Sequence, residues 1–200
     1  MIRLIVADDE EMIRTAIVSL LTMEEDLDIV AQSDNGADAV ALARAHRPDV
    51  VLLDLEMPPT DGIETASQIL KTVDTHAVLM TRHARPGVLK RAMAAGITGF
   101  VPKSTPVERL AVVVRDIADG RRYVDPELAA QALNSEACPL TDRELDALRL
   151  TRSHLPVQQI AVTLHLAEGT VRNYLSSAMT KTDTDSRHAA ADLAWQQGWI

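Results

Sequence analysis

The first 120 residues alternate short apolar runs with stretches of helical periodicity, and no other feature constrains the fold as strongly. The apolar runs predict five strands, at residues 3–7, 27–32, 50–53, 77–80 and 99–101. Patterns typical of helices lie between and after these strands, near residues 10–22, 35–46, 63–72, 86–95 and 106–118. Strands that alternate with helices predict a doubly wound, five-stranded parallel sheet with helices on both faces.

The pattern changes after residue 120. Turn signals at Asp125-Pro126 and Cys138-Pro139 flank a short helical stretch, so we expect a linker over residues 121–138. Thr141 and Glu144 then have the spacing of a helix capping box. Four helices and no strand follow, near residues 142–151, 157–164, 168–181 and 186–197. The sequence therefore predicts an α/β domain over residues 1–120 and a small all-α domain over residues 139–200.

Chemically active side chains follow four of the predicted strands: Asp8 and Asp9, Asp54, Thr81, and Lys103. In a parallel sheet the carboxyl ends of the strands meet at one edge, so these side chains should converge. Clustered carboxylates favour a hard divalent cation, and Mg²⁺ is the natural choice. The Asp54 carboxylate could then accept a phosphoryl group, with Lys103 and Thr81 contacting its oxygens. Taken alone, Asp8 and Asp9 also fit a simple helix N-cap.

Charge and cysteine content limit the class of protein. Net charge is −9, which argues against non-specific binding of polyanions. Residues 139–200 carry 6 basic and 7 acidic side chains, so DNA binding there would depend on a few well-placed cations. Cys138 is the only cysteine, which excludes an internal disulfide. Without a signal peptide pattern or an apolar run of membrane-spanning length, we expect a cytoplasmic protein with no direct membrane insertion.

The strand-end residues, together with Pro58, Gly62, Phe100 and Pro102, resemble the receiver domain of two-component response regulators, which has a flavodoxin-like fold. The resemblance covers residues 1–120. It implies that Mg²⁺ is bound by Asp8, Asp9, Asp54 and the backbone carbonyl of Glu56, and that a sensor histidine kinase phosphorylates Asp54. It further implies that Thr81 and Lys103 sense the phosphoryl group and that Phe100 is the switch aromatic.

Arg82 departs from the receiver pattern, in which the residue after the switch threonine is commonly small. One hypothesis is that Arg82 overhangs the acyl phosphate and slows phosphotransfer or extends its lifetime. The alternative is that Arg82 points to solvent.

Three stretches in register, beginning at Leu140, Gln159 and Glu168, resemble the four-helix effector domain of NarL/LuxR (FixJ) regulators. In such helix-turn-helix domains the second helix of the motif enters the major groove of double-stranded DNA. The resemblance makes Arg172 the main candidate for a base contact, with Asn173 and Ser176 as further candidates. Contacts to phosphates are expected from Thr170, Tyr174 and Lys181.

Four residues depart from this second pattern. Ala167 replaces a capping serine, His154 replaces a turn glycine, and Thr182-Asp183 replaces a Leu-Gly pair. We expect them to weaken DNA binding, so that a dimer is needed. The last helix, with Trp195 and the Gly198-Trp199-Ile200 ending, resembles the element that pairs two such domains, although ordinary core packing is the alternative.

Together these features predict a transcription regulator, not an enzyme, that dimerises on phosphorylation and binds promoter DNA. Short stretches such as Ala84-Arg85-Pro86-Gly87 resemble the DesR-like branch of the family, which implies control of membrane-lipid (desaturase) genes. One alternative is a phosphorylation-independent DNA-binding protein that uses the receiver for dimerisation. Another is an Mg²⁺-dependent phosphohydrolase, but such enzymes usually place the nucleophile on the first strand.

Overall fold

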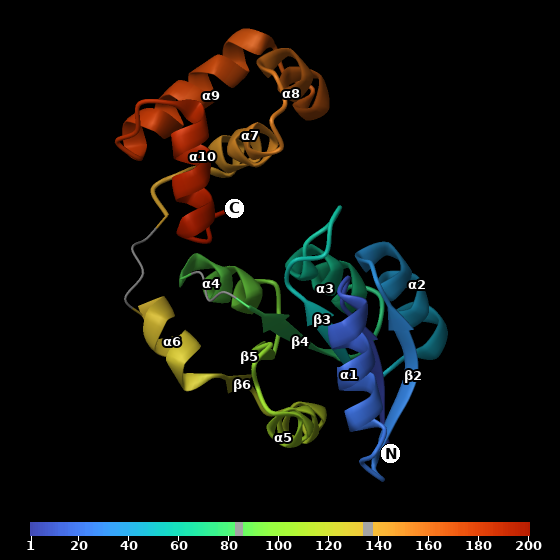
Figure 1. Ribbon diagram of the computed structural model, residues 1–200. Helices are drawn as coiled ribbons and strands as arrows, with labels where there is room; N and C mark the ends of the chain where they lie inside the picture. Colours follow the sequence, from blue (N-terminus) through green and yellow to red (C-terminus); the bar gives the residue numbers. More distant parts are fainter. Residues whose placement is uncertain (83–85, 134–137) are drawn as a thin grey trace. The chain divides into compact units, whose positions relative to one another are not determined.

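The computed structural model describes residues 1–82, 86–133 and 138–200, which form two compact units (Figure 1). His83, Ala84 and Arg85 lie outside the described residues, as do residues 134–137 of the predicted linker. Most of residues 1–131 belongs to the first unit, and the helices from residue 142 onward belong to the second.

The first unit is built on a parallel sheet with the strand order β2-β1-β3-β4-β5-β6. Its strands are β1 (Ile2–Ala7), β2 (Leu27–Ser33), β3 (Val50–Asp54), β4 (His76–Thr81), β5 (Gly99–Pro102) and β6 (Tyr123–Val124). The predicted doubly wound parallel fold is confirmed, and each predicted strand agrees with the structure to within one residue at either end. The sheet gains β6, whose two residues pair with Gly99 and Phe100 of β5. Two residues are too short to produce a periodic pattern, which is why the sequence predicted only five strands.

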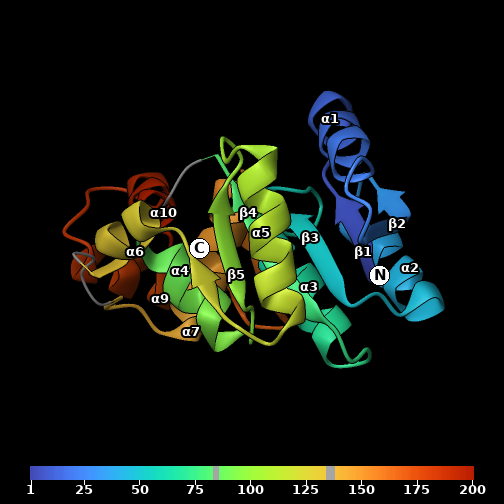
Figure 2. The same ribbon diagram turned by 90° about the horizontal axis from the view of Figure 1, so that it is seen from below.

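Helices alternate with these strands. Their bounds are α1 (Glu11–Leu21), α2 (Gly36–His46), α3 (Gly62–Leu70), α4 (Pro86–Ala94), α5 (Val107–Ala118) and α6 (Pro126–Leu133). α5 crosses one face of the sheet while α3 lies behind it (Figure 2). β6 and α6 both fall within the range that the sequence predicted as a linker.

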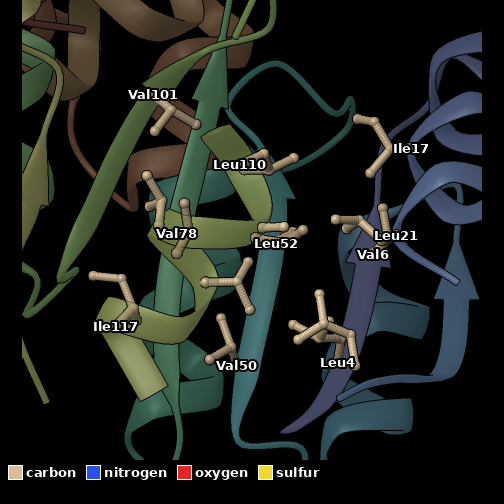
Figure 3. Packing of buried hydrophobic residues seen from close by; sticks show 14 of the residues in the cluster. Leu4, Val6, Ile17, Leu21, Val50, Leu52, Val78, Val101, Leu110 and Ile117 are labelled. Atoms are coloured by element: carbon tan, nitrogen blue, oxygen red, sulfur yellow. The ribbon is translucent and has the colours of Figure 1, made fainter. Parts of the chain in front are cut away.

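The core of the first unit explains why the strands read as continuous apolar runs. Leu4, Val6 and Leu52 pack against Leu21 of α1 and Leu110 of α5 on one face (Figure 3). Side chains of a strand alternate between faces, so the intervening residues, which are also buried, pack against the opposite helix layer. A sheet that is covered on both faces presents polar side chains mainly beyond its strand ends, where the site lies.

The second unit contains helices only in its described part: α7 (Asp142–Arg152), α8 (Val157–Leu164), α9 (Glu168–Lys181) and α10 (Arg187–Gln196). The capping box predicted at Thr141 and Glu144 is present at the start of α7. Val171 and Leu175 of α9 are buried in the core of this unit, and Trp199 packs into the same core. Among all described residues, no helix is both long enough and apolar enough to cross a bilayer.

Candidate functional site

Asp8 and Asp54 lie side by side at the carboxyl edge of the sheet. β1 and β3 are neighbours, with Ala7 opposite Leu53, so the residues that follow them meet. Both acids are buried, with relative exposures of 0% and 2%. One carboxylate oxygen from each of Asp8, Asp9, Glu10 and Asp54 lies within 4.8 Å of the others. The structure therefore brings the three predicted acids together and adds Glu10 to them.

Lys103, directly after β5, completes the pocket. Its Nζ lies 2.9 Å from Asp8 Oδ2, 2.9 Å from Asp54 Oδ2 and 2.8 Å from Glu10 Oε1. The lysine is positioned by its backbone N–H, which donates a hydrogen bond to the Thr81 carbonyl at 2.8 Å. One ammonium group is thus shared by three carboxylates.

The charges of the pocket perturb one another. Burial raises the pKa of the Asp54 carboxyl, and the nearby charge of Asp8 adds to this, while the ion pair with Lys103 opposes it. Burial alone would lower the pKa of Lys103, but the close contacts with the carboxylates of Glu10, Asp54 and Asp8 outweigh it and raise that pKa. The ammonium therefore stays charged at neutral pH and stabilises the carboxylates beside it.

The carboxylate oxygens of the pocket suit a divalent cation. Asp8 Oδ2 is buried and accepts no hydrogen bond of good geometry from the described residues, although the Lys103 ammonium lies nearby. Such an oxygen retains the capacity to bind a cation, and Mg²⁺ prefers oxygen ligands. Glu56 follows β3 closely, and its backbone makes a hydrogen bond to the Asp54 carboxylate.

The two predicted switch residues lie in the neighbouring strands. Thr81 ends β4 opposite Pro102, and Phe100 lies in β5 opposite Leu79. Their relative exposures are 1% and 2%, so both side chains are buried. Gly62, at the start of α3, packs so closely on this edge that a Cβ there would collide with the Asp54 carbonyl oxygen.

Sequence reasoning missed Glu10 as part of the pocket. Its carboxylate forms an ion pair with Lys103 through one oxygen and with Arg82 through the other. The run of four acidic residues from Asp8 to Glu11 was the available signal. Arg82, whose side chain is 52% exposed, is held at the pocket by Glu10.

The second candidate site is the exposed face of α9. Arg172, Asn173 and Ser176 are exposed on it, whereas Thr170 is partly buried. Arg172 Nη2 lies 2.6 Å from Glu168 Oε2, one helical turn earlier. Such exposed pairs are weak, so the Arg172 guanidinium can exchange Glu168 for another anionic partner.

Two of the residues predicted to contact phosphates have partners within their own domain. The Tyr174 ring packs against the apolar core of the second unit. Lys181 Nζ donates a hydrogen bond to Glu144 Oε2 at 2.8 Å, and the Lys181 side chain is 35% exposed.

Two of the four departures from the family pattern have a backbone conformation that glycine would favour. His154 has a φ of 59° and Asp183 a φ of 50°, both in the left-handed region. Ala167 supplies no side-chain cap to α9 in the part of the chain that the structure describes. Trp195 is partly buried, and the Arg152 guanidinium lies 4.1 Å from the centroid of its ring.

Comparisons with known proteins match two families to this chain. The family model of the response regulator receiver domain matches residues 4–115, and that of the luxR family of bacterial regulatory proteins matches residues 138–194. The chain is 38% identical to the transcriptional regulatory protein DesR of Bacillus subtilis, over 100% of both chains. It is 35% identical to the response regulator RamR of Streptomyces coelicolor, over 100% of this chain and 98% of RamR.

A solved structure has the same two-part architecture. The response regulator ChrA, of a heme-sensing two-component system, is 28% identical and matches with a TM-score of 0.59. The match covers 100% of this chain and 98% of ChrA.

Proposed function

We propose that Asp54 is the phosphoryl acceptor of this chain, which belongs to the LuxR-type response regulators. The chain is a phosphorylation-activated DNA-binding regulator of transcription. The observation that carries this proposal is the placement of the Asp54 carboxylate 2.9 Å from Lys103 and among the other pocket acids. A sensor histidine kinase is the proposed donor. An Asp54 oxygen attacks phosphorus, the bond from phosphorus to the donor imidazole breaks, and that nitrogen keeps the electron pair and takes a proton from water.

The residues of the pocket have distinct proposed roles in this transfer. Asp8, Asp9, Asp54 and the Glu56 carbonyl would hold Mg²⁺, which when bound supplies positive charge to the phosphoryl oxygens. Lys103 pairs with one phosphoryl oxygen, and the Thr81 hydroxyl donates to another.

The signal passes from this pocket to a surface of the domain. Engagement of Thr81 favours one packing of Phe100, and the altered receiver surface then promotes a homodimer. We propose residues 1–120 as the receiver, 121–138 as the segment that leads to the effector domain, and 139–200 as the effector domain. The first part of that segment, β6, extends the receiver sheet.

DNA recognition is assigned to α9 in the same proposal. Arg172, Asn173 and Ser176 would contact base edges of promoter DNA, and Thr170, Tyr174 and Lys181 the phosphates, once Lys181 leaves Glu144. Action on the chromosome places the protein in the cytoplasm. Its similarity to DesR supports membrane-lipid genes as the target.

The test combines phosphorylation and mass. The full chain is incubated with Mg²⁺ and phosphoramidate, and then separately with Mg²⁺ and beryllofluoride for light scattering. We expect a gain of one phosphoryl group by intact mass and a shift from monomer to dimer, both lost in Asp54→Ala. Equal promoter affinity of wild type and Asp54→Ala, with and without the donor, would instead support a receiver that only dimerises.

A further inference from the structure

Glu10 joins two cations that come from different strand ends. Its Oε1 accepts a hydrogen bond from Lys103 Nζ at 2.8 Å, and its Oε2 accepts one from Arg82 Nη2. Lys103 follows β5 and Arg82 follows β4, so a single carboxylate connects them across the mouth of the pocket.

The residues behind this bridge are closed to solvent. The side chain of Asp54 is 3% exposed and that of Lys103 is 5% exposed. The side chains of Glu10 and Arg82 are 35% and 52% exposed, so they form the outer layer of the pocket. The Glu10–Arg82 ion pair is therefore the part of this charge cluster that contacts solvent most.

The Lys103 ammonium is surrounded by carboxylates in this arrangement. Three of them, from Asp8, Glu10 and Asp54, lie within 2.9 Å of Nζ, and the Glu10 carboxylate accepts a hydrogen bond from it. A phosphoryl oxygen that pairs with Lys103 must therefore displace one of them. Asp8 is fully buried and Asp54 carries the phosphoryl group, whereas Glu10 lies on a partly exposed helix terminus.

We infer that Glu10 occupies the position of a phosphoryl oxygen in the unphosphorylated chain and that Arg82 holds it there. This inference rests on the proposed function of Asp54. On phosphorylation the Glu10 carboxylate leaves Lys103, and Arg82 exchanges that carboxylate for the phosphoryl group, which carries more negative charge. Glu10 thus limits how fast the chain accepts a phosphoryl group, and Arg82 limits how fast the chain loses it.

The test compares Glu10→Gln with Glu11→Gln, which removes the same charge from the exposed neighbouring residue. Mg²⁺ affinity is first measured for each variant, so that all rates are taken at saturating Mg²⁺. Phosphorylation by phosphoramidate is then followed by intact mass. We expect Glu10→Gln to react about tenfold faster, the effect of one lost charge-assisted hydrogen bond, and Glu11→Gln to stay within about twofold of wild type.

Arg82 is tested through the lifetime of the phosphorylated chain. Arg82→Ala should shorten that lifetime by about tenfold, because one charge-assisted contact to the phosphoryl group is lost. Glu11→Gln should leave the lifetime within about twofold of wild type. The Arg82 side-chain Nε–H resonance, assigned with Arg82→Ala, gives a readout without turnover, and it should move on beryllofluoride binding in wild type.

The outcomes separate this inference from the proposed function. If Glu10→Gln reacts no faster than Glu11→Gln, or if Arg82→Ala leaves the lifetime unchanged, the inference is overturned while phosphorylation of Asp54 stands. The proposed function is overturned if wild type gains no phosphoryl group, or if it gains one that is still present in Asp54→Asn. In either case the inference is overturned with it.

Discussion

At the scale of single residues, Glu144 connects the start of α7 to the end of α9. Its carboxylate accepts hydrogen bonds from the Thr141 backbone at 2.7 Å, Ser177 Oγ at 2.6 Å and Lys181 Nζ at 2.8 Å. Burial alone would raise the pKa of Glu144, but these hydrogen bonds outweigh it and lower the pKa from 4.5 to about 2. Proton binding at Glu144 is thus coupled to the folding of this domain.

We predict that Glu144 governs the acid stability of the helical domain. Because the pKa of Glu144 is lowered in the folded state, the ionised carboxylate stabilises the folded domain. This stabilisation is complete above about pH 4.5 and is lost as the pH falls toward 2. Glu144→Gln should cost about 2 kcal/mol at pH 7 and flatten the stability profile between pH 5 and 3. Urea unfolding followed by tryptophan fluorescence reports this domain alone, because both tryptophans lie in it. Glu168→Gln is the control, and an equal loss there would contradict the prediction.

His154 has a backbone conformation that favours glycine, since its φ is 59°. A Cβ in the left-handed region costs about 1 kcal/mol, and the exposed ring stacks on His188. His154→Gly should therefore raise the free energy of unfolding by about 0.5 to 1 kcal/mol in the same assay. Gln158→Gly, within α8, should instead lower it by about 1 kcal/mol. A loss of stability in both variants would mean that the ring stack outweighs the backbone strain.

At the scale of elements, α9 combines a well-packed inner face with a weak start. Val171, Leu175 and Ala178 are buried at helical spacing and fix the rotation of the helix. That rotation leaves Arg172 and Asn173 on the outer face. The N-cap position, Ala167, has the extended backbone that a capping residue needs but no side-chain oxygen.

Restoring a capping oxygen should stabilise α9. We predict that Ala167→Ser increases the stability of the domain by about 1 kcal/mol, because its hydroxyl can accept a hydrogen bond from a backbone N–H of the first turn. Ala167→Val adds bulk without an oxygen and serves as the matched control. If valine stabilises the domain as much as serine, capping is not the cause.

At the scale of the whole molecule, the low positive charge of the effector domain makes a second copy important. With 6 basic and 7 acidic residues in positions 139–200, one copy can neutralise few DNA phosphates. The salt dependence of DNA affinity is proportional to the number of phosphates neutralised. The steepness of the salt dependence therefore reports how many effector domains contact the DNA.

We predict that phosphorylation doubles this salt dependence. The slope of log affinity against log salt concentration should be about twice as steep for the phosphorylated chain as for Asp54→Ala, because two effector domains then contact the DNA. Fluorescence anisotropy with a promoter fragment at several salt concentrations measures both slopes. Equal slopes with different affinities would show that phosphorylation acts without adding a second copy.

The sequence by itself determined the parallel sheet and its helices, the all-helical second unit and the convergence of Asp8, Asp54 and Lys103. These follow from local periodicity and from the rule that parallel strands end at one edge, and neither depends on side-chain detail. The Thr141–Glu144 capping box was predictable for the same reason, since its partners lie three residues apart.

Only the tertiary structure decided which partners the long charged side chains take. Glu10 and Arg82 are 72 residues apart in sequence, and Glu144 and Lys181 are 37 apart. No periodicity connects such residues, and a flexible charged side chain has many possible partners until the fold brings one within reach. For the same reason β6 was missed, because its two residues become a strand only through pairing with β5.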